Sequence, residues 1–214
     1  MAFDNLAQCG AEQCSSYADN VLFSYSGTDI TYAEAWVRIR AKARFLEKEG
    51  FRAGDVVGLL AENSPEWCFA FMAVTSIGCI VVPLDTGLPR ERYDSMLNFV
   101  GAKAVFLSAS FSDVQTSVRK FFVDDGAEPG DQPFSVPSLS LKSPAAYLFT
   151  SGTTGDPKVV TLTHGNVLHI ATVCTSFEEY TEKDVTLAIL PLFHLYALES
   201  SFLAPFLNVR SIVL

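Results

Sequence analysis

The sequence predicts an α/β fold in which helices cover both faces of a mostly parallel sheet. Helix and strand signals alternate along the 214 residues, as they do in domains built from βαβ units. The segment Asp55–Leu60 is apolar without the alternation of a half-exposed strand, which is expected when both faces of a strand are covered. Hydrophobic residues make up 49% of the chain and charged residues 18%, so a large core can form and global disorder is excluded.

The first elements have clear local signals. Val21–Tyr25 predicts a short strand that ends in a turn. Thr31 and Glu34 have the spacing of a capping box, so we expect a helix to begin there. Apolar residues then follow at helical spacing until Gly50, where the helix is predicted to end.

An uncharged stretch, Trp67–Leu84, raises the question of a membrane span because about 20 apolar residues suffice to cross a bilayer. Gly78 and Pro83 would interrupt a spanning helix. We therefore predict a buried helix that begins at Ser64–Pro65 and stops near Gly78, followed by the strand Cys79–Val82.

The middle of the chain continues the alternation. A helix is predicted to open near Pro89 and to run past Leu97, and Lys103–Leu107 predicts the next strand. Ser112 and Gln115 have the spacing of a second capping box, which predicts another helix. The apolar stripe of that helix would comprise Val114, Val118 and Phe121.

A glycine- and proline-rich stretch, Asp124–Pro137, predicts a linker or long surface loop. It divides the chain into an α/β segment over 1–123, a linker or loop over 124–144, and a second α/β segment over 145–214. The second segment is predicted to contain a helix from about Asn166. Its expected strands are Ala145–Phe149, Val159–Leu162, Val185–Leu190 and one that begins at Arg210 and has nothing after it, which suggests a fragment.

Charge and cysteine content exclude several classes of protein. The net charge of −9 argues against a protein that neutralises nucleic-acid phosphates. The five cysteines are widely spaced and form no metal-binding motif, so we expect free thiols in a reducing, cytoplasmic setting. The N-terminus has neither the basic nor the apolar region of a secretory signal.

The segment 150–158 carries the chemistry. Glycines let backbone N–H groups approach an anion closely, hydroxyls add short donors, and lysine adds a point charge. This composition suits a polyphosphate. The segment is not a Walker A loop, because Pro157 precedes the lysine and a β-branched run follows it. The candidate phosphate-binding residues are Thr150, Ser151, Gly152, Thr153, Thr154, Gly155 and Lys158.

The segment Phe149–Asn166 resembles the signature of the adenylate-forming (AMP-binding) superfamily, which includes acyl-CoA synthetases, aryl-CoA ligases, luciferases and nonribosomal adenylation domains. Supporting stretches occur in the family's order, from Thr31–Glu34 through Glu62–Trp67 to Leu190–Tyr196. Val159 departs from the family's usual glycine after the lysine, which could stiffen the loop.

The resemblance implies a reaction and a set of ligands. Members join a carboxylic acid to ATP, release pyrophosphate, and in acyl-CoA synthetases pass the acyl group to coenzyme A. By resemblance, the seven loop residues would hold the β and γ phosphates, and His194 and Tyr196 would face the acyl carboxylate and the adenylate. Mg²⁺ would assist, but its usual glutamate ligand lies in a family segment that is absent here, and no metal ligand is assigned.

Several implications of the resemblance stay open. The chain would be the N-terminal part of an acyl-CoA synthetase, without the family's adenine-binding segment, ribose-binding aspartate and catalytic C-terminal lysine, so we predict no catalytic residue here and no activity for the 214 residues alone. A fatty acid is the first expected substrate and an aryl acid the second. The alternative is a non-catalytic nucleotide- or partner-binding module. Exposed apolar surface left by missing segments would favour a homo-oligomer.

Other conspicuous side chains receive structural interpretations from the sequence. We interpret one histidine as marking a helix entrance and one as lying on a helix face, two tryptophans as core residues, and one aspartate as forming a turn. They are His164, His169, Trp36, Trp67 and Asp85.

Overall fold

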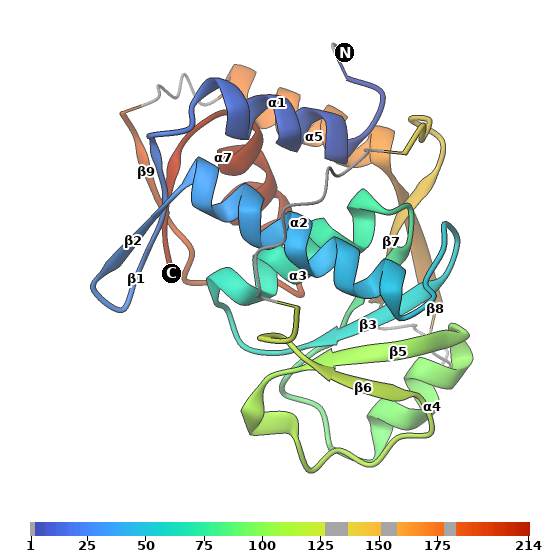
Figure 1. Cartoon of the computed structure of the whole chain (residues 1–214). Helices are drawn as coiled ribbons and strands as arrows, with labels where there is room; N and C mark the ends of the chain where they lie inside the picture. The colour runs from blue at the N-terminus through green and yellow to red at the C-terminus, as the bar shows by residue number, and fades with distance from the viewer. Residues whose placement is uncertain (1–2, 127–136, 151–157, 178–182) are drawn as a thin grey trace.

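The computed structural model describes residues 3–126, 137–150, 158–177 and 183–214, without the side chains of 175–177. Within these residues the chain forms two sheets with helices between and around them (Figure 1). The α/β class with a mostly parallel sheet is therefore confirmed.

The larger sheet has the strand order β6-β5-β3-β4-β7-β8. Neighbouring strands are parallel except β7 and β8, which form an antiparallel pair at one edge. Strands from 1–123 and from 145–214 thus share one sheet, and the proposed domain boundaries stay a prediction. The strands are β3 (Val56–Leu60), β4 (Ile80–Pro83), β5 (Ala102–Leu107), β6 (Arg119–Phe122), β7 (Pro144–Thr150) and β8 (Lys158–Thr163).

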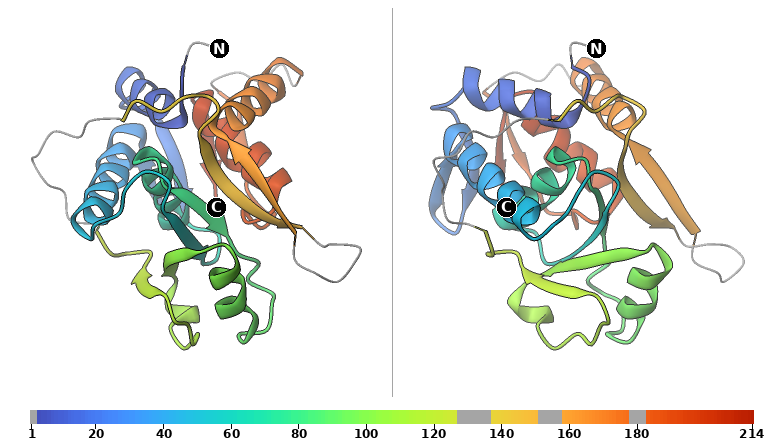
Figure 2. Two further views of the ribbon diagram at one scale, coloured as in Figure 1. Left: turned by 90° about the vertical axis from the view of Figure 1, so that its right-hand side faces the viewer. Right: turned by 45° about the vertical axis from the view of Figure 1, so that its right-hand side comes forward.

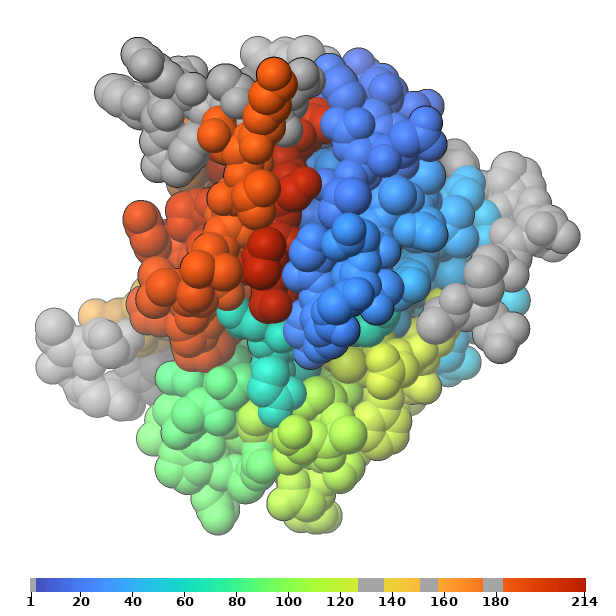
Figure 3. Space-filling model, turned by 90° about the vertical axis from the view of Figure 1, so that its left-hand side faces the viewer, coloured from blue at the N-terminus to red at the C-terminus, as the bar shows by residue number. Residues whose placement is uncertain are grey.

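The smaller sheet joins the two ends of the chain. Its order is β2-β1-β10-β9, and Figure 3 shows the red β10 between the blue β1 and the orange β9. The β1–β2 hairpin turns at Ser26 and Gly27, whose φ angles of 50° and 77° match the positive values that a tight hairpin turn requires. The strands are β1 (Val21–Tyr25), β2 (Thr28–Thr31), β9 (Val185–Leu187) and β10 (Ser211–Val213).

Helices cover both faces of the larger sheet, as predicted (Figure 2). Along β3, Val57 and Leu59 belong to the core under α2 and α3, whereas Val56 and Leu60 belong to the core under α4. This explains why the strand shows no alternation. The helices are α1 (Leu6–Ser16), α2 (Tyr32–Lys48), α3 (Pro65–Ser76), α4 (Arg92–Phe99), the 3₁₀ turn η1 (Ala109–Phe111), α5 (His164–Phe177), α6 (Leu195–Ala197), the π-helix η2 (Leu198–Leu203) and α7 (Ala204–Leu207).

Predictions that rest on local contacts are confirmed. Thr31 and Glu34 form a complete capping box at the start of α2. Ser64 caps α3, whose first residue is Pro65. The uncharged stretch divides into α3 and β4, and no helix in the described part of the chain is long and apolar enough to cross a membrane.

The helix predicted from the Ser112 capping box is wrong. After η1 the chain passes through a turn and a bend and becomes the edge strand β6, in which Phe121 pairs with Phe106 of β5. Asp94 of α4 fixes the residues that precede this strand. Its carboxylate accepts hydrogen bonds from the Ser117 amide at 2.7 Å and from the Thr116 hydroxyl at 3.0 Å. A contact more than 20 residues away therefore overrides the local helix signal.

Two further differences concern element boundaries. The helix α1 was not predicted; it begins at Asn5, whose side chain accepts a hydrogen bond from the Gln8 amide. The strand β9 ends at Leu187, earlier than the predicted Leu190, because its partner β10 ends at Val213, which pairs with Leu187.

Candidate functional site

The first part of the site is the β7–β8 hairpin at the edge of the larger sheet (Figure 2). Thr150 pairs with Lys158, so the two residues that flank segment 151–157 lie opposite each other. Both are exposed. The other predicted phosphate-binding residues, Ser151, Gly152, Thr153, Thr154 and Gly155, lie outside the described residues.

Packing fixes the hairpin at both of its strands. Phe149 of β7 packs against the core beneath α4, and its ring centroid lies 6.3 Å from that of Phe99. At the end of β8, Thr163 and Asn166 exchange hydrogen bonds that cap the start of α5. The hairpin thus presents Lys158 from a fixed base.

His164 holds the junction of β8 and α5, and it is buried, as the structural interpretation expects. Its Nδ1 accepts a hydrogen bond from the Leu6 amide at 3.2 Å, and its own amide donates to the Ser143 carbonyl at 3.0 Å. One side chain therefore joins the start of α1 to the base of the hairpin. Burial lowers the pKa of His164 to about 4 from the ordinary 6.5.

This shift makes the stability of the fold depend on pH. The folded state binds the His164 proton more weakly than the unfolded state, so stability present above pH 6.5 is lost as pH falls towards 4. A shift of this size corresponds to about 3 kcal/mol. We expect His164→Asn, which can keep the acceptor without titrating, to remove that part of the pH dependence in urea denaturation at pH 4.5 and 7. The exposed His169→Asn should leave the dependence unchanged.

The second part of the site is the segment after β9, which carries His194 and Tyr196. Both side chains are exposed, Tyr196 by 69%. His194 is the N-cap of α6, and its amide donates to the Pro191 carbonyl. Exposed Leu195 lies between them, so the imidazole ring of His194, the aliphatic side chain of Leu195 and the ring of Tyr196 all face solvent.

Asn63, in the connection between β3 and α3, positions this segment. Its side-chain nitrogen donates to the carbonyls of Ala188 and Leu190, and its side-chain oxygen accepts from the Leu192 amide at 2.9 Å. These three bonds hold the backbone beyond Leu187, where the pairing of β9 with β10 ends. The signal for Asn63 in the sequence is weak: it follows a buried strand and lies in the family-like stretch Glu62–Trp67.

The structure places the two parts of the site on different supports. Thr150 and Lys158 belong to the larger sheet, whereas His194 is the N-cap of α6 and Tyr196 lies within α6, after β9 of the smaller sheet. Among the described residues no hydrogen bond or ion pair joins the side chains of the two parts. The roles of these residues in binding phosphate and acyl groups therefore stay predictions.

A metal site is not formed by the described part of the chain. It contains no group of three or more histidine, cysteine, aspartate or glutamate side chains that could hold an ion. Thr150, Lys158, His194 and Tyr196 supply no carboxylate for Mg²⁺. Within the described part of the chain, these four residues do not fit this ion. The donors and the positive charge at Thr150 and Lys158 do suit a phosphate.

An α/β fold with a glycine- and hydroxyl-rich segment between two paired strands defines a candidate nucleotide-binding protein. The chain belongs to the family described as AMP-binding enzyme, whose model matches residues 10–214. The resemblance to adenylate-forming enzymes is thereby confirmed.

Individual relatives support this assignment. The chain is 30% identical to 4-coumarate–CoA ligase CCL1 of Humulus lupulus over 94% of its own length and 40% of the relative. It is 33% identical to the hybrid PKS-NRPS synthetase apdA of Emericella nidulans, over 73% of its own length and 4% of the relative. The chain therefore spans less than half of these curated relatives.

A solved structure shows the same fold. O-succinylbenzoate coenzyme A synthetase (MenE) from Bacillus subtilis, in complex with AMP, matches with a TM-score of 0.87 and 25% identity. The match covers 96% of this chain and 54% of that chain.

Proposed function

We propose that the chain is the N-terminal part of an ATP-dependent acid–thiol ligase that forms an acyl-adenylate and then an acyl-CoA. The observation that carries the proposal is the β7–β8 hairpin, which presents exposed Lys158 opposite Thr150 beside the hydroxyl-rich segment. A charged ammonium group at this place would attract the leaving pyrophosphate, so catalysis would be mainly positioning and charge stabilisation. ATP and coenzyme A would be the co-substrates.

A small carboxylic acid would be the other substrate. We propose a fatty acid first, because exposed Leu195 and Tyr196 beside His194 offer apolar surface to an acyl chain. An aryl acid is the second candidate, favoured by the similarity to 4-coumarate–CoA ligases. A panel that pairs fatty acids with aryl acids of similar size would separate the two by binding affinity.

Phosphate binding is tested at Lys158. We expect Lys158→Ala to weaken the binding of ATP and of pyrophosphate by about tenfold or more, because one charge-assisted contact is lost. Isothermal titration calorimetry of the 214-residue chain measures this. Lys142→Ala, an exposed lysine before β7, is the matched control and should bind as the unchanged chain does. Equal binding by the Lys158 variant, or no binding by the unchanged chain, would contradict the proposal.

The 214 residues alone are proposed to be inactive. ATP–pyrophosphate exchange with a panel of carboxylic acids tests this, and detectable exchange would overturn it. Calorimetric binding without exchange would agree with a fragment and also with the alternative of a non-catalytic binding module. Exchange by a longer form of the protein would then decide for the ligase.

Compartment and assembly are proposed on physical grounds. None of the five cysteines is in a disulfide and four of them are buried, which suits a reducing, cytoplasmic environment. Large apolar side chains on and after β9 are exposed, namely Val185, Leu187, Ile189 and Leu190. Such a surface favours association, so we propose a homo-oligomer of this chain, which light scattering would detect.

A further inference from the structure

The helix that carries His194 and Tyr196 contains a π-helical turn. Residues 195–207 run continuously through α6, η2 and α7, and the Ala204 amide donates to the Glu199 carbonyl five residues before it. Pro205 supplies a cause, because its missing N–H removes a helical donor and its ring would crowd the carbonyl four residues earlier. Turns of this kind hold one residue more than an α-helical turn and often occur at functional sites.

Glu199 lies in this turn and is buried, with 4% of its surface exposed. Both of its carboxyl oxygens lack a hydrogen-bond partner within the described residues. Native proteins rarely leave a buried polar group unpaired, and a buried charge without a partner costs far more than a buried neutral group. Burial raises the pKa of Glu199 to about 8, so the acid is largely neutral at pH 7.

The elements around the turn offer no positive side chain to compensate a carboxylate. The helices α5, α6 and α7 pack on η2, and Phe202 also contacts rings on α3 and β1. None of these five elements contains a lysine or an arginine. Their titratable residues are His164, His169 and Cys174 on α5, Tyr196 on α6, Glu66 and Cys68 on α3, and Tyr25 on β1.

We propose that Glu199 is a positioning residue for the segment His194–Tyr196. As a buried neutral acid, Glu199 keeps the π turn in the observed form, which we call closed. Ionisation of Glu199 shifts the turn to a rearranged, open form. The negative charge can be solvated only when the turn rearranges, because none of these five elements supplies a cation. Conversion of the π turn to an α-helical turn shifts the register by one residue, which is a rotation of about 100°. The ring of His194 and the side chain of Tyr196 would turn with it.

The direction of the pH effect follows from proton linkage. The closed turn binds the Glu199 proton more strongly than an open turn, whose glutamate has the ordinary pKa of 4.5. Closure is therefore most stable below pH 4.5 and weakens as pH rises towards 8. The titration of His164 has the opposite effect, because its pKa is lowered and it stabilises the fold as pH rises. Its hydrogen bond is to α1 and not to this helix.

Amide hydrogen exchange of the 214-residue chain tests the proposal. In the unchanged chain, protection factors of amides in 197–204 should fall about a hundredfold between pH 5 and 7, which is tenfold per pH unit for one linked proton. The fall should level off above about pH 8. The isosteric Glu199→Gln and the apolar Glu199→Met, of similar length, should remove it, and either variant suffices if the other does not fold. Glu12→Gln, on an exposed position of α1, loses the same charge and should behave as the unchanged chain.

The same pH dependence in the Glu199 variants, or a fall in protection spread evenly over the whole chain, would overturn the proposal. The consequence for substrate binding rests on the proposed function of His194 and Tyr196, but the exchange measurement does not. A pH-dependent turn without ATP binding would leave Glu199 as a positioning residue and reject the ligase function. ATP binding together with a pH-independent turn would support the ligase function and reject the positioning role of Glu199.

Discussion

Phe202→Ala should lower the free energy of unfolding by about 4 kcal/mol. Phe202 is 1% exposed, and its ring centroid lies 5.9 to 6.4 Å from four other aromatic rings. Truncation removes these contacts and leaves a cavity that rigid neighbours cannot fill. The four rings belong to Phe23 of β1, Trp67 and Phe71 of α3, and Phe206 of α7.

Because Phe202 contacts several parts of the fold, its truncation should lower the stability of the whole fold. Its contacts join the smaller sheet, the helix α3 between the sheets, and the helix that carries the candidate site. For a chain of this size the loss corresponds to a fall in melting temperature of about 8–16 °C. Urea denaturation followed by circular dichroism measures the free energy.

A matched control separates this cluster from a general cost of removing a phenylalanine. Phe122→Ala, on the edge strand β6, removes a ring that is 41% exposed and should cost about 1 kcal/mol or less. Similar losses for the two variants would show that the central cluster contributes no more than an exposed ring. Phe202→Leu should retain a large part of the stability, because it fills most of the same space.

The sequence predicted those parts of the fold that depend on neighbouring residues. The capping box of Thr31 and Glu34 spans four residues and forms as expected. Asp85 fixes its turn through a hydrogen bond from the Gly87 amide, two residues away. Trp67 is in the core because α3 is largely apolar on all sides from Trp67 onwards, and Trp36 is partly buried because α2 has apolar residues at helical spacing.

Tertiary contacts decided the parts that the sequence did not predict. Ser112 and Gln115 looked like a capping box, but hydrogen bonds to Asp94 and the pairing of β6 with β5 hold the residues that follow in a non-helical conformation. The helix α1 has a weak apolar pattern of its own and is buried through neighbours such as Met72 and Phe206, which approach Gly10. No local pattern reveals contacts of this range.

The candidate site shows the same difference between residues with a local sequence signal and residues that depend on tertiary contacts. The residues of segment 150–158 are adjacent in sequence, so their composition alone points to phosphate chemistry. Asn63 carries only a weak signal in the sequence and Glu199 carries none, since their importance depends on what surrounds them after folding. Asn63 binds backbone more than 120 residues away, and Glu199 stands out only because its carboxyl group is buried without a partner among the described residues.

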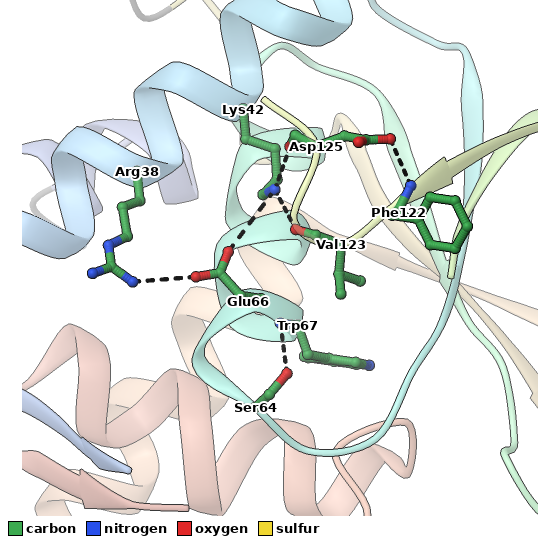
Figure 4. Close-up of polar contacts among 8 residues, drawn as sticks. All are labelled: Arg38, Lys42, Ser64, Glu66, Trp67, Phe122, Val123 and Asp125. Atoms are coloured by element: carbon green, nitrogen blue, oxygen red, sulfur yellow. Dashed lines mark hydrogen bonds and ion pairs between the residues drawn. The ribbon is translucent and has the colours of Figure 1, made fainter. Parts of the chain in front are cut away.

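Lys42→Met should destabilise the fold by about 3 kcal/mol, the second large effect that the structure predicts. Lys42 is fully buried in α2, and its ammonium group donates to the carbonyls of Val123 and Asp125 (Figure 4). It also lies 4.0 Å from a carboxylate oxygen of Glu66, whose other oxygen pairs with Arg38. The lysine thus ties the chain that leaves β6 to the helices above the sheet.

The expected loss comes from what the substitution leaves behind. Methionine fills most of the space of the lysine stem, so the packing cost is small, but two carbonyls lose a charged donor and Glu66 loses one of its two cations. Burial lowers the pKa of Lys42 and raises that of Glu66, and each group offsets the burial of the other. Removal of one partner is therefore costly even where replacement of both by apolar side chains can be neutral.

Lys48→Met provides the comparison, because it makes the same change on the same helix at an exposed position and should cost less than about 0.5 kcal/mol. Limited proteolysis adds a local readout. Cleavage near residues 123–126 should accelerate in the Lys42 variant beyond what its lower global stability explains, since the anchored carbonyls are released. Equal stability of the two variants, with unchanged cleavage, would mean that the buried ammonium group does not anchor this segment.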